Sequence, residues 1–141
     1  MVILVVKNKM IIEDLKDKRH FLELHQQVFG VMKDIITPDI IKLIKKDNGD
    51  TVGFLSGYMA YDNSFYIQYA GIMPEFRNKG FIRHFKSMLE DNVSYITATE
   101  NTNTAAMKTL MVTGFLPIGG RYGGDLKYYV EWSRPRRSDN G

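Results

Sequence analysis

The stretch PEFRNKGFIRHF, residues 74–85, joins a strand-like run to a helix-like pattern of apolar residues. Pro74 ends the apolar run, and Gly80 lies within a basic turn. An apolar stripe with helical spacing follows at once, at Phe81, Ile82 and Phe85. The first turn of a helix leaves backbone N–H groups unpaired and carries a partial positive charge, so a turn that leads into it can hold phosphate oxygens. The order of strand, cationic turn and helix therefore predicts a site for an anionic ligand such as a pyrophosphate.

The residues of this turn support the prediction and leave one alternative open. Arg77, Lys79 and Arg83 place cations around Gly80, whose missing side chain allows a ligand to approach the backbone closely. The alternative is an ordinary solvated basic surface, because a single R-x-x-G occurs by chance in many proteins. The spacing matches neither G-x-x-x-x-G-K-[ST] nor G-x-G-x-x-G, which excludes those two classes of nucleotide-binding loop.

The composition indicates one globular domain. With 141 residues, 44% of them hydrophobic, the chain can bury one core and is too short for two ordinary domains. We expect a single domain at 1–133 and a basic, disordered tail at 134–141, because RPRRSDNG has no apolar residue to bury. The N-terminal run MVILVV is shorter than a signal-peptide core or a membrane span, so we expect a buried strand there and no membrane partner.

Cysteine and charge narrow the class of protein further. The sequence contains no cysteine, which excludes disulfides, thiolate zinc sites and cysteine nucleophiles and fits a cytoplasmic location, where thiols stay reduced. The net charge of +3 is mildly basic. Basic and aromatic residues do not alternate in a recognisable nucleic-acid-binding motif, so nucleic acid is disfavoured as a partner.

The histidines predict no metal site. His20 and His25 lie in the expected first helix at a spacing of five, which does not place both rings on one face, and no second pair of ligands completes a site. We interpret them as structural or solvent-facing, and His84 as a solvated or phosphate-neighbouring side chain.

The expected elements alternate between helical and β patterns. They are a helix at 11–32 with a break at Gly30, a helix at 37–47 between Thr37-Pro38-Asp39 and Asn48-Gly49, a hairpin of strands at 51–61 and 64–73, a helix ending near Asn92, a strand at 93–100, a helix at 103–112, and strands at 115–122 and 126–133. This order predicts an α/β (α+β) fold with a mixed sheet.

Two motifs in this order resemble those of the GNAT acetyltransferases. IMPEFRNKGFI resembles the family's acetyl-CoA-binding motif, in which a strand leads through [QR]-x-x-G-x-[GA] into a helix. NTNTAAMKTLMVTGF is similar to its second motif, with Asn103, Ala106, Gly114 and Phe115 at the characteristic places. Together the motifs cover residues 64–116, which makes the pair far more specific than either motif alone.

The resemblance implies a GNAT-like, mostly antiparallel central sheet flanked by helices, and an N-acetyltransferase that uses acetyl-CoA as co-substrate. A primary amine of a small molecule or peptide would attack the thioester directly, and a backbone N–H would stabilise the oxyanion. GNAT-like domains often pair, so a homodimer is a further expectation. The implied acetyl-CoA-binding residues are Gly71, Ile72, Met73, Arg77, Asn78, Lys79, Gly80, Phe81, Ile82, Asn103 and Ala106.

The resemblance has two departures. Ile82 occupies the place of a small residue in the phosphate motif, so its side chain must point into the core for a pyrophosphate to approach. Leu110 occupies the place where many members carry a tyrosine that protonates the leaving thiolate. A catalytically weak or inactive GNAT-fold module with a regulatory or protein-binding role is therefore the alternative function.

The candidate catalytic residues are Tyr69, Glu100 and Asn103. Tyr69 on the central strand is a candidate acid, as are Tyr122, Tyr128 and Tyr129 near the last hairpin, although each is also typical of an aromatic residue packed on a sheet. The strand 64–73 contains no carboxylate, so Glu100 is the nearest candidate base, with water or Gln68 as the alternative relay. Asn103 would lie beside the pantetheine arm or the edge of the acetyl site.

Overall fold

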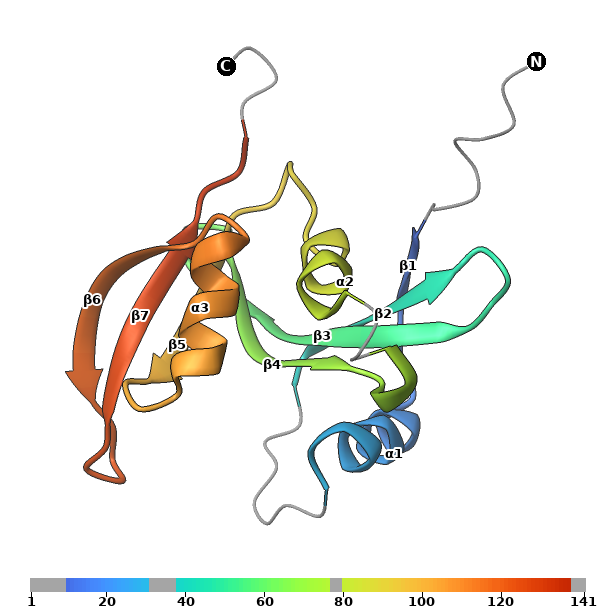
Figure 1. Cartoon of the computed structure of the whole chain (residues 1–141), viewed down its shortest axis with the longest axis horizontal. Helices are drawn as coiled ribbons and strands as arrows, with labels where there is room; N and C mark the ends of the chain where they lie inside the picture. Colours follow the sequence, from blue (N-terminus) through green and yellow to red (C-terminus); the bar gives the residue numbers. More distant parts are fainter. Residues whose placement is uncertain (1–9, 31–37, 77–79, 138–141) are drawn as a thin grey trace. The chain divides into compact units, whose positions relative to one another are not determined.

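The computed structural model describes residues 10–30, 38–76 and 80–137 (Figure 1). Along the chain the elements are β1 (Met10–Asp14), α1 (Lys18–Phe29), β2 (Ile40–Lys46), β3 (Thr51–Met59), β4 (Phe65–Ile72), the 3-10 helix η2 (Pro74–Phe76), α2 (Phe81–Ser87), β5 (Tyr95–Glu100), α3 (Thr104–Val112), β6 (Leu116–Tyr122) and β7 (Tyr128–Arg134).

The strands form one seven-stranded sheet in the order β1-β2-β3-β4-β5-β7-β6. The β4–β5 ladder is parallel, whereas the β1–β2, β2–β3, β5–β7 and β6–β7 ladders are antiparallel. This confirms the predicted α/β fold with a mixed, mostly antiparallel sheet. The chain falls into two compact units, the first made of Met1–Tyr58 with Gln68–Met88 and the second of Met59–Ile67 with Leu89–Gly141.

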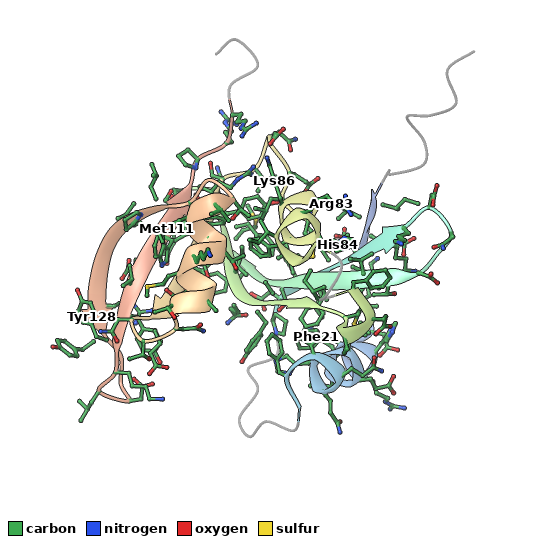
Figure 2. All side chains as sticks on the ribbon, viewed as in Figure 1. Phe21, Arg83, His84, Lys86, Met111 and Tyr128 are labelled. Carbon is green, nitrogen blue, oxygen red and sulfur yellow. The ribbon has the colours of Figure 1, made fainter. Side chains whose placement is uncertain are left out.

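In the first unit, α1 and α2 lie on opposite faces of strands β2 to β4 (Figure 1). The α1 helix begins where the Asp17 side chain accepts hydrogen bonds from the first turn and ends at Gly30, whose φ is 79°. Figure 2 shows Phe21 pointing from α1 toward the sheet. The core on this side joins two α1 residues to three strand residues and one loop residue: Phe21, Leu24, Ile41, Leu43, Phe54 and Met73.

The prediction of a helix at 37–47 is wrong. Ile40–Lys46 form β2, which pairs with β1 on one side and β3 on the other, and Thr37 lies outside the described residues. Because α1 and α2 cover opposite faces of this part of the sheet, β2 buries apolar residues on both of its faces, and its sequence reads as a short continuous apolar run that periodicity does not separate from a helix. The β-branched residues Ile40, Ile41 and Ile44 favour the strand.

The boundaries of two predicted helices also change. Met10–Asp14 form β1 and pair with β2, so the first helix begins at Lys18 and the expected helix at 11–32 is too long at its start. The helix expected to end near Asn92 ends at Ser87. The expected N-terminal strand MVILVV lies outside the described residues.

The hairpin at 51–73 is confirmed as β3 and β4, which are neighbours in the sheet. The connection turns at Asn63, whose N–H donates to the carbonyl oxygen of Ala60 at 3.0 Å and whose φ is 63°. Asn is one of the few residues other than glycine that adopts this left-handed conformation readily, which explains why Asp62-Asn63 marks the turn.

In the second unit, α3 lies over β5 and β7 (Figure 1). The buried Trp132 donates from Nε1 to Thr99 Oγ1 at 2.9 Å. Arg134 is only 4% exposed, and its Nε donates to the carbonyl oxygen of Thr113 at the end of α3 at 3.0 Å. Arg134 is therefore the last residue of β7 and not the first residue of a disordered tail. Residues 138–141 lie outside the described residues.

Candidate functional site

The backbone N–H and C=O groups at the end of β4 point alternately to the two edges of the strand. The N–H of Met73 donates to the carbonyl oxygen of Val52 at 2.7 Å, so it faces β3. The carbonyl oxygen of Gly71 also faces β3, since a Cβ added at Gly53 would overlap it. Alternate residues of a strand direct their N–H and C=O groups to opposite edges, so those of Ile72 face away from β3. Of the three residues expected to pair with pantetheine, Ile72 has the suitable backbone orientation.

Gly71 has a packing role. A Cβ at this position would lie 2.8 Å from Cγ1 of Val28 on α1 and 2.9 Å from Cε1 of Phe54 on β3. Both distances are shorter than real Cβ contacts, so α1 packs against β4 only because residue 71 has no side chain. The glycine in this part of the motif is thus explained by the approach of the helix.

Gly80 begins α2 in a left-handed conformation, with φ 87° and ψ 55°. A Cβ there would meet Nε of Arg83 at 3.5 Å, which is an ordinary contact. The need for glycine therefore comes from the backbone conformation, because a side chain is strained at positive φ. No side chain of the described residues caps this helix end. Arg77, Asn78, Lys79 and the side chain of Phe81 lie outside the described residues.

The first turn of α2 contains Ile82, one of the two residues that depart from the family's motifs. Ile82 is 40% exposed, so its side chain does not point into the core as the resemblance requires. Arg83 and Lys86 are exposed on the same helix, whereas His84 is buried and lies on the side that faces the sheet (Figure 2). The expectation that His84 is solvated is therefore wrong: its ring packs edge-on against Phe76, with the centroids 5.7 Å apart.

An aromatic layer fills the space between α1 and β4. The His25 ring lies 4.7 Å from the rings of both Tyr69 and Phe29, and Phe21 and Phe54 complete the layer. His25 is fully buried, and neither of its ring nitrogens has a hydrogen-bond partner within the described part of the chain. Burial lowers the pKa of His25 below its ordinary value and so favours the neutral ring.

Tyr69 belongs to this layer and packs on the core of the first unit. The structure thus gives the candidate acid the role of a packed aromatic residue. Its neighbour Gln68 points to the opposite face of the sheet, because successive residues of a strand alternate between faces. Gln68 Oε1 is buried with no hydrogen-bond partner among the described residues. Buried polar atoms are nearly always paired, so this oxygen is a stronger sign of a ligand than the Tyr69 ring.

In the second unit, Asn103 is the N-cap of α3. Its Oδ1 accepts a hydrogen bond from the N–H of Ala106 at 3.1 Å, and its own N–H donates to the carbonyl oxygen of Glu100 at 2.9 Å. The asparagine and the alanine three residues later, which the motif pairs in sequence, thus form one capping interaction. This interaction leaves Asn103 Nδ2 as the side-chain group available to a ligand.

Glu100 ends β5, and its carboxylate lies 3.9 Å from the ammonium of Lys127. Both side chains are partly exposed, so this contact is weak and leaves the carboxylate accessible. Leu110 on α3 is buried, and its carbonyl oxygen accepts from Phe115 N–H at 3.0 Å. The position where many GNAT members carry a tyrosine is therefore part of the core of this unit.

The three late tyrosines lie on the β6–β7 hairpin. The rings of Tyr122 and Tyr128 meet edge-on with centroids 5.1 Å apart. Tyr129 donates its hydroxyl to Asp125 Oδ2 at 2.6 Å, and this hydrogen bond raises the pKa of Tyr129 and lowers that of Asp125. A tyrosine held by its own carboxylate is a poor proton donor to a second group, so Tyr129 is not supported as an acid.

Within residues 10–30, 38–76 and 80–137, no three His, Cys, Asp or Glu side chains gather as a metal site would require. None of the helices in the same ranges is long and apolar enough to cross a membrane.

No protein-family model matches the sequence, and no curated protein matches it either. Solved structures do match. The ribosomal-protein-S18-alanine N-acetyltransferase from Escherichia coli superposes with a TM-score of 0.64 at 15% identity, over 94% of this chain and 99% of that chain. A spermidine N-acetyltransferase chimera from Vibrio cholerae gives 0.65 at 16% identity, over 90% and 95%. A Bacillus anthracis protein in complex with acetyl coenzyme A gives 0.50 at 18% identity, over 72% and 64%.

The chain therefore has the fold of the GNAT N-acetyltransferases. The likeness extends over nearly the whole chain, and at these identities it concerns the fold.

Proposed function

We propose that this protein is an acetyl-CoA-dependent N-acetyltransferase that acts on a primary amine by direct attack. The observation that carries the proposal is Gly80. It adopts a left-handed conformation between β4 and α2, which is the place that the acetyl-CoA motif RNKG assigns to it within the GNAT fold. The conformation of Gly80 and its place in the motif both support the proposal.

The binding residues follow from the backbone. Ile72 would pair with the amides of the pantetheine arm through the edge of β4 that faces away from β3, as a strand pairs with its neighbour. Residues 77–82 would hold the pyrophosphate through main-chain N–H groups, with Arg83 and Lys86 adding positive charge. Asn103 Nδ2 is proposed as a further donor on the grounds of the motif, with Ala106 fixing the cap that orients it.

The reaction moves two protons. The attacking ammonium must lose one proton before its lone pair forms the C–N bond, and the nitrogen loses a second proton once that bond has formed, while the C–S bond breaks to release a thiolate that takes up one proton. We assign the proton acceptor to Glu100, whose carboxylate is accessible at the end of β5, and the alternative is a proton relay through water or Gln68. Water is proposed as the donor to the thiolate, because Leu110 is apolar and Tyr69 is packed.

The acceptor is an amine of a small molecule or a peptide. The two full-length structural neighbours named above act, by their names, on the alanine of a ribosomal protein and on spermidine, so both kinds of amine belong in a screen. The cysteine-free sequence agrees with the proposed cytoplasmic location.

The test combines binding with turnover. Acetyl-CoA at about a hundred times its dissociation constant should stabilise the protein by roughly 2.7 kcal/mol, a melting shift on the order of 5–10 °C. Gly80→Asp should remove this shift, because it adds a side chain and a negative charge against the phosphates. Gly49→Asp is the matched control, since Gly49 also has a positive φ, of 94°, and has open space around it. Equal shifts in both variants would place the ligand elsewhere and remove the main support for the proposal.

A second function is favoured by two observations. Leu110 is buried where an acid is common, and Ile82 lies on the surface of the phosphate turn. Leu110 fits a GNAT-fold module without efficient transfer, and Ile82 fits one with weak or no CoA binding; such a module would act through another protein. The two functions differ in thiol release: the enzyme releases CoA with at least one amine of a peptide and polyamine panel, whereas the module shows no release above the rate without amine.

A further inference from the structure

A lysine of the second unit lies in the turn that joins β6 to β7 (Figure 1). Lys127 is the last residue of this turn, and its ammonium nitrogen lies 3.9 Å from Oε1 of Glu100 at the end of β5. The Lys127 side chain is 56% exposed, so a ligand in solution can reach it. A primary amine of the chain therefore lies beside the carboxylate that is assigned above as the proton acceptor.

Hydrogen bonds fix the backbone of this turn. The N–H of Lys127 donates to Asp125 Oδ1 at 3.0 Å, and its carbonyl oxygen accepts from the N–H of Gly123 at 2.8 Å. The other carboxylate oxygen of Asp125 accepts from the Tyr129 hydroxyl at 2.6 Å. Tyr129 is in turn the partner of Glu100 in the β5–β7 ladder. The sheet thus sets the place of the Lys127 backbone beside Glu100, and the flexible part is the four-carbon lysine side chain.

The same end of β5 is joined to the motif residue that we expect to contact acetyl-CoA. The N–H of Asn103 donates to the carbonyl oxygen of Glu100 at 2.9 Å. The N–H of Asn101 donates to the carbonyl oxygen of Tyr128, the residue after Lys127, also at 2.9 Å. The expected ligand of the pantetheine arm, the proton acceptor and a primary amine therefore belong to one hydrogen-bonded part of the second unit.

We propose that Lys127 is a self-acetylation site: its ε-amine takes the acetyl group of the acetyl-CoA bound to the same chain, and Glu100 accepts the proton. This inference rests on the proposed function, because it requires bound acetyl-CoA and the assigned role of Glu100. It extends that function by naming an acceptor amine within the protein itself.

The step balances in atoms and charge. The Lys127 ammonium gives one proton to Glu100, and the freed lone pair of Nζ attacks the carbonyl carbon of the thioester. The C–N bond forms and the C–S bond breaks, the thiolate takes up one proton, and the nitrogen loses its second proton to water. The products are acetyl-lysine and CoA, with one proton released to solvent once Glu100 has passed on the proton that it accepted.

The geometry allows this proton transfer after a small movement. Transfer needs a separation of about 2.6–3.2 Å or one bridging water, so Nζ has to approach the carboxylate by roughly 1 Å or act through water. Rotation within the lysine side chain supplies such a movement, and the contact is weak enough to be broken when the amine attacks. Because amine and proton acceptor belong to one chain, the reaction needs no encounter with a second protein molecule.

Acetylation would also change the site. It replaces the ammonium of Lys127 by a neutral amide, which ends the ion pair with Glu100. Until then Lys127 competes with an external amine for the same carboxylate. The modified protein therefore presents the proton acceptor without a neighbouring positive charge from Lys127.

The main experiment incubates the full chain with saturating acetyl-CoA and no added amine, and mass spectrometry follows the intact protein and its peptides. We expect one acetyl group per chain, on Lys127, at a first-order rate that stays constant when the protein is diluted. A rate that falls in proportion to dilution would show transfer between protein molecules and would overturn the proposal.

Two lysine variants form a matched pair. Lys127→Arg keeps the positive charge at an exposed position and should abolish the acetylation. Lys108→Arg changes an exposed lysine on α3 of the same unit and should be acetylated as fast as the unmodified protein. Acetylation that persists at the same rate in Lys127→Arg would contradict the assignment.

A second lysine–glutamate pair separates this reaction from simple chemical acetylation. Lys45 Nζ lies 3.0 Å from Glu13 Oε2 in the first unit, closer than Lys127 lies to Glu100. If a nearby carboxylate alone were enough, Lys45 would be acetylated as fast as Lys127, and the proposal would fail. Glu100→Gln should slow the acetylation of Lys127 at least about tenfold, and an unchanged rate would also overturn the proposal.

The melting shift with acetyl-CoA shows which of the two proposals fails. A protein that acetyl-CoA stabilises and that acetylates an external amine, but leaves Lys127 unmodified, would overturn the self-acetylation and leave the proposed function intact. A protein that shows neither the shift nor thiol release with any amine would overturn both.

Discussion

Replacing His25 by leucine should stabilise the protein. The buried imidazole has one N–H donor and one acceptor nitrogen, and neither has a hydrogen-bond partner in the part of the chain that the structure describes. An unpaired buried polar group costs about 1–3 kcal/mol, and leucine fills a similar volume with no polar atom. We therefore expect the free energy of unfolding of His25→Leu to rise by about 1–3 kcal/mol at pH 7.5, which raises the melting temperature by roughly 3–10 °C.

The effect depends on pH with a defined sign. Because burial lowers the folded-state pKa of His25 below the ordinary value of about 6.5, the unfolded chain binds the proton more readily than the folded protein. The pH-dependent part of the free energy of unfolding that comes from His25 is thus at its maximum above pH 6.5, and it is lost as the pH falls through the folded-state pKa. The slope from this one group is at most about 1.4 kcal/mol per pH unit. In His25→Leu this slope is absent, so the advantage of the variant grows as the pH falls from 7 to 5.

The assay is urea unfolding of the unmodified protein and the variant at pH 5, 6, 7 and 8. His20→Leu, on the same helix but partly exposed, is the control and should change stability by less than about 0.5 kcal/mol at every pH. The reasoning would be refuted if His25→Leu lowered the stability at pH 7.5, or if the difference between the variant and the unmodified protein did not change with pH. Loss of acetyl transfer together with increased stability would instead show that the buried imidazole serves function.

Four substitutions give further predictions. Gly71→Ala should lower the free energy of unfolding by about 1–3 kcal/mol, measured by urea unfolding, because its Cβ would press on α1 at 2.8 Å; no loss would mean that the helix can move. Asn103→Ala should cost about 1 kcal/mol through the lost cap of α3, whereas the exposed Asn101→Ala should cost nothing; equal costs would contradict the capping role. Leu110→Tyr should destabilise the second unit by about 1–3 kcal/mol through overpacking and should leave turnover no higher, and a faster acetyl transfer would show that the site accepts an acid there. Ile82→Ala should leave the melting temperature nearly unchanged and strengthen acetyl-CoA binding in a thermal-shift titration; weaker binding would mean that the exposed side chain itself contacts the ligand.

The features of the candidate site that sequence reasoning can reach are those set by neighbouring residues. Gly80 is required by its own backbone dihedral, and Asn103 caps the helix that begins at the next residue, so both roles are readable from neighbouring residues. The hairpin turn at Asn63 belongs to the same class. The two-motif resemblance identified the fold because it combined such local features in the correct order.

Burial that depends on tertiary packing could not be predicted from the sequence in the same way. The run Ile40–Lys46 became a strand because β1 and β3 lie on its two sides, which its own residues do not encode. Leu110 and His84 are buried and Ile82 is exposed because of how each helix packs, although all three have apolar neighbours in the sequence. Nor could the sequence predict that the ring nitrogens of His25 lack a hydrogen-bond partner among the described residues, because a spacing of five from His20 does not indicate the aromatic layer in which His25 packs.

The interleaving of the two units constrains how the chain is made. Neither unit is continuous: β4 contributes its first residues to one unit and the rest to the other, and the segment Gln68–Met88 of the first unit interrupts the second. During synthesis from the N-terminus, Phe65 and Tyr66 leave the ribosome before the β5 residues with which they pair, Tyr95 and Ile96. The edge of β4 that pairs with β5 therefore stays unpaired while α2 and the loop that follows it are translated. Stalling in this interval would leave an exposed strand in the nascent chain, so the codons for residues 73–94 are where slow translation would most endanger the yield of folded protein.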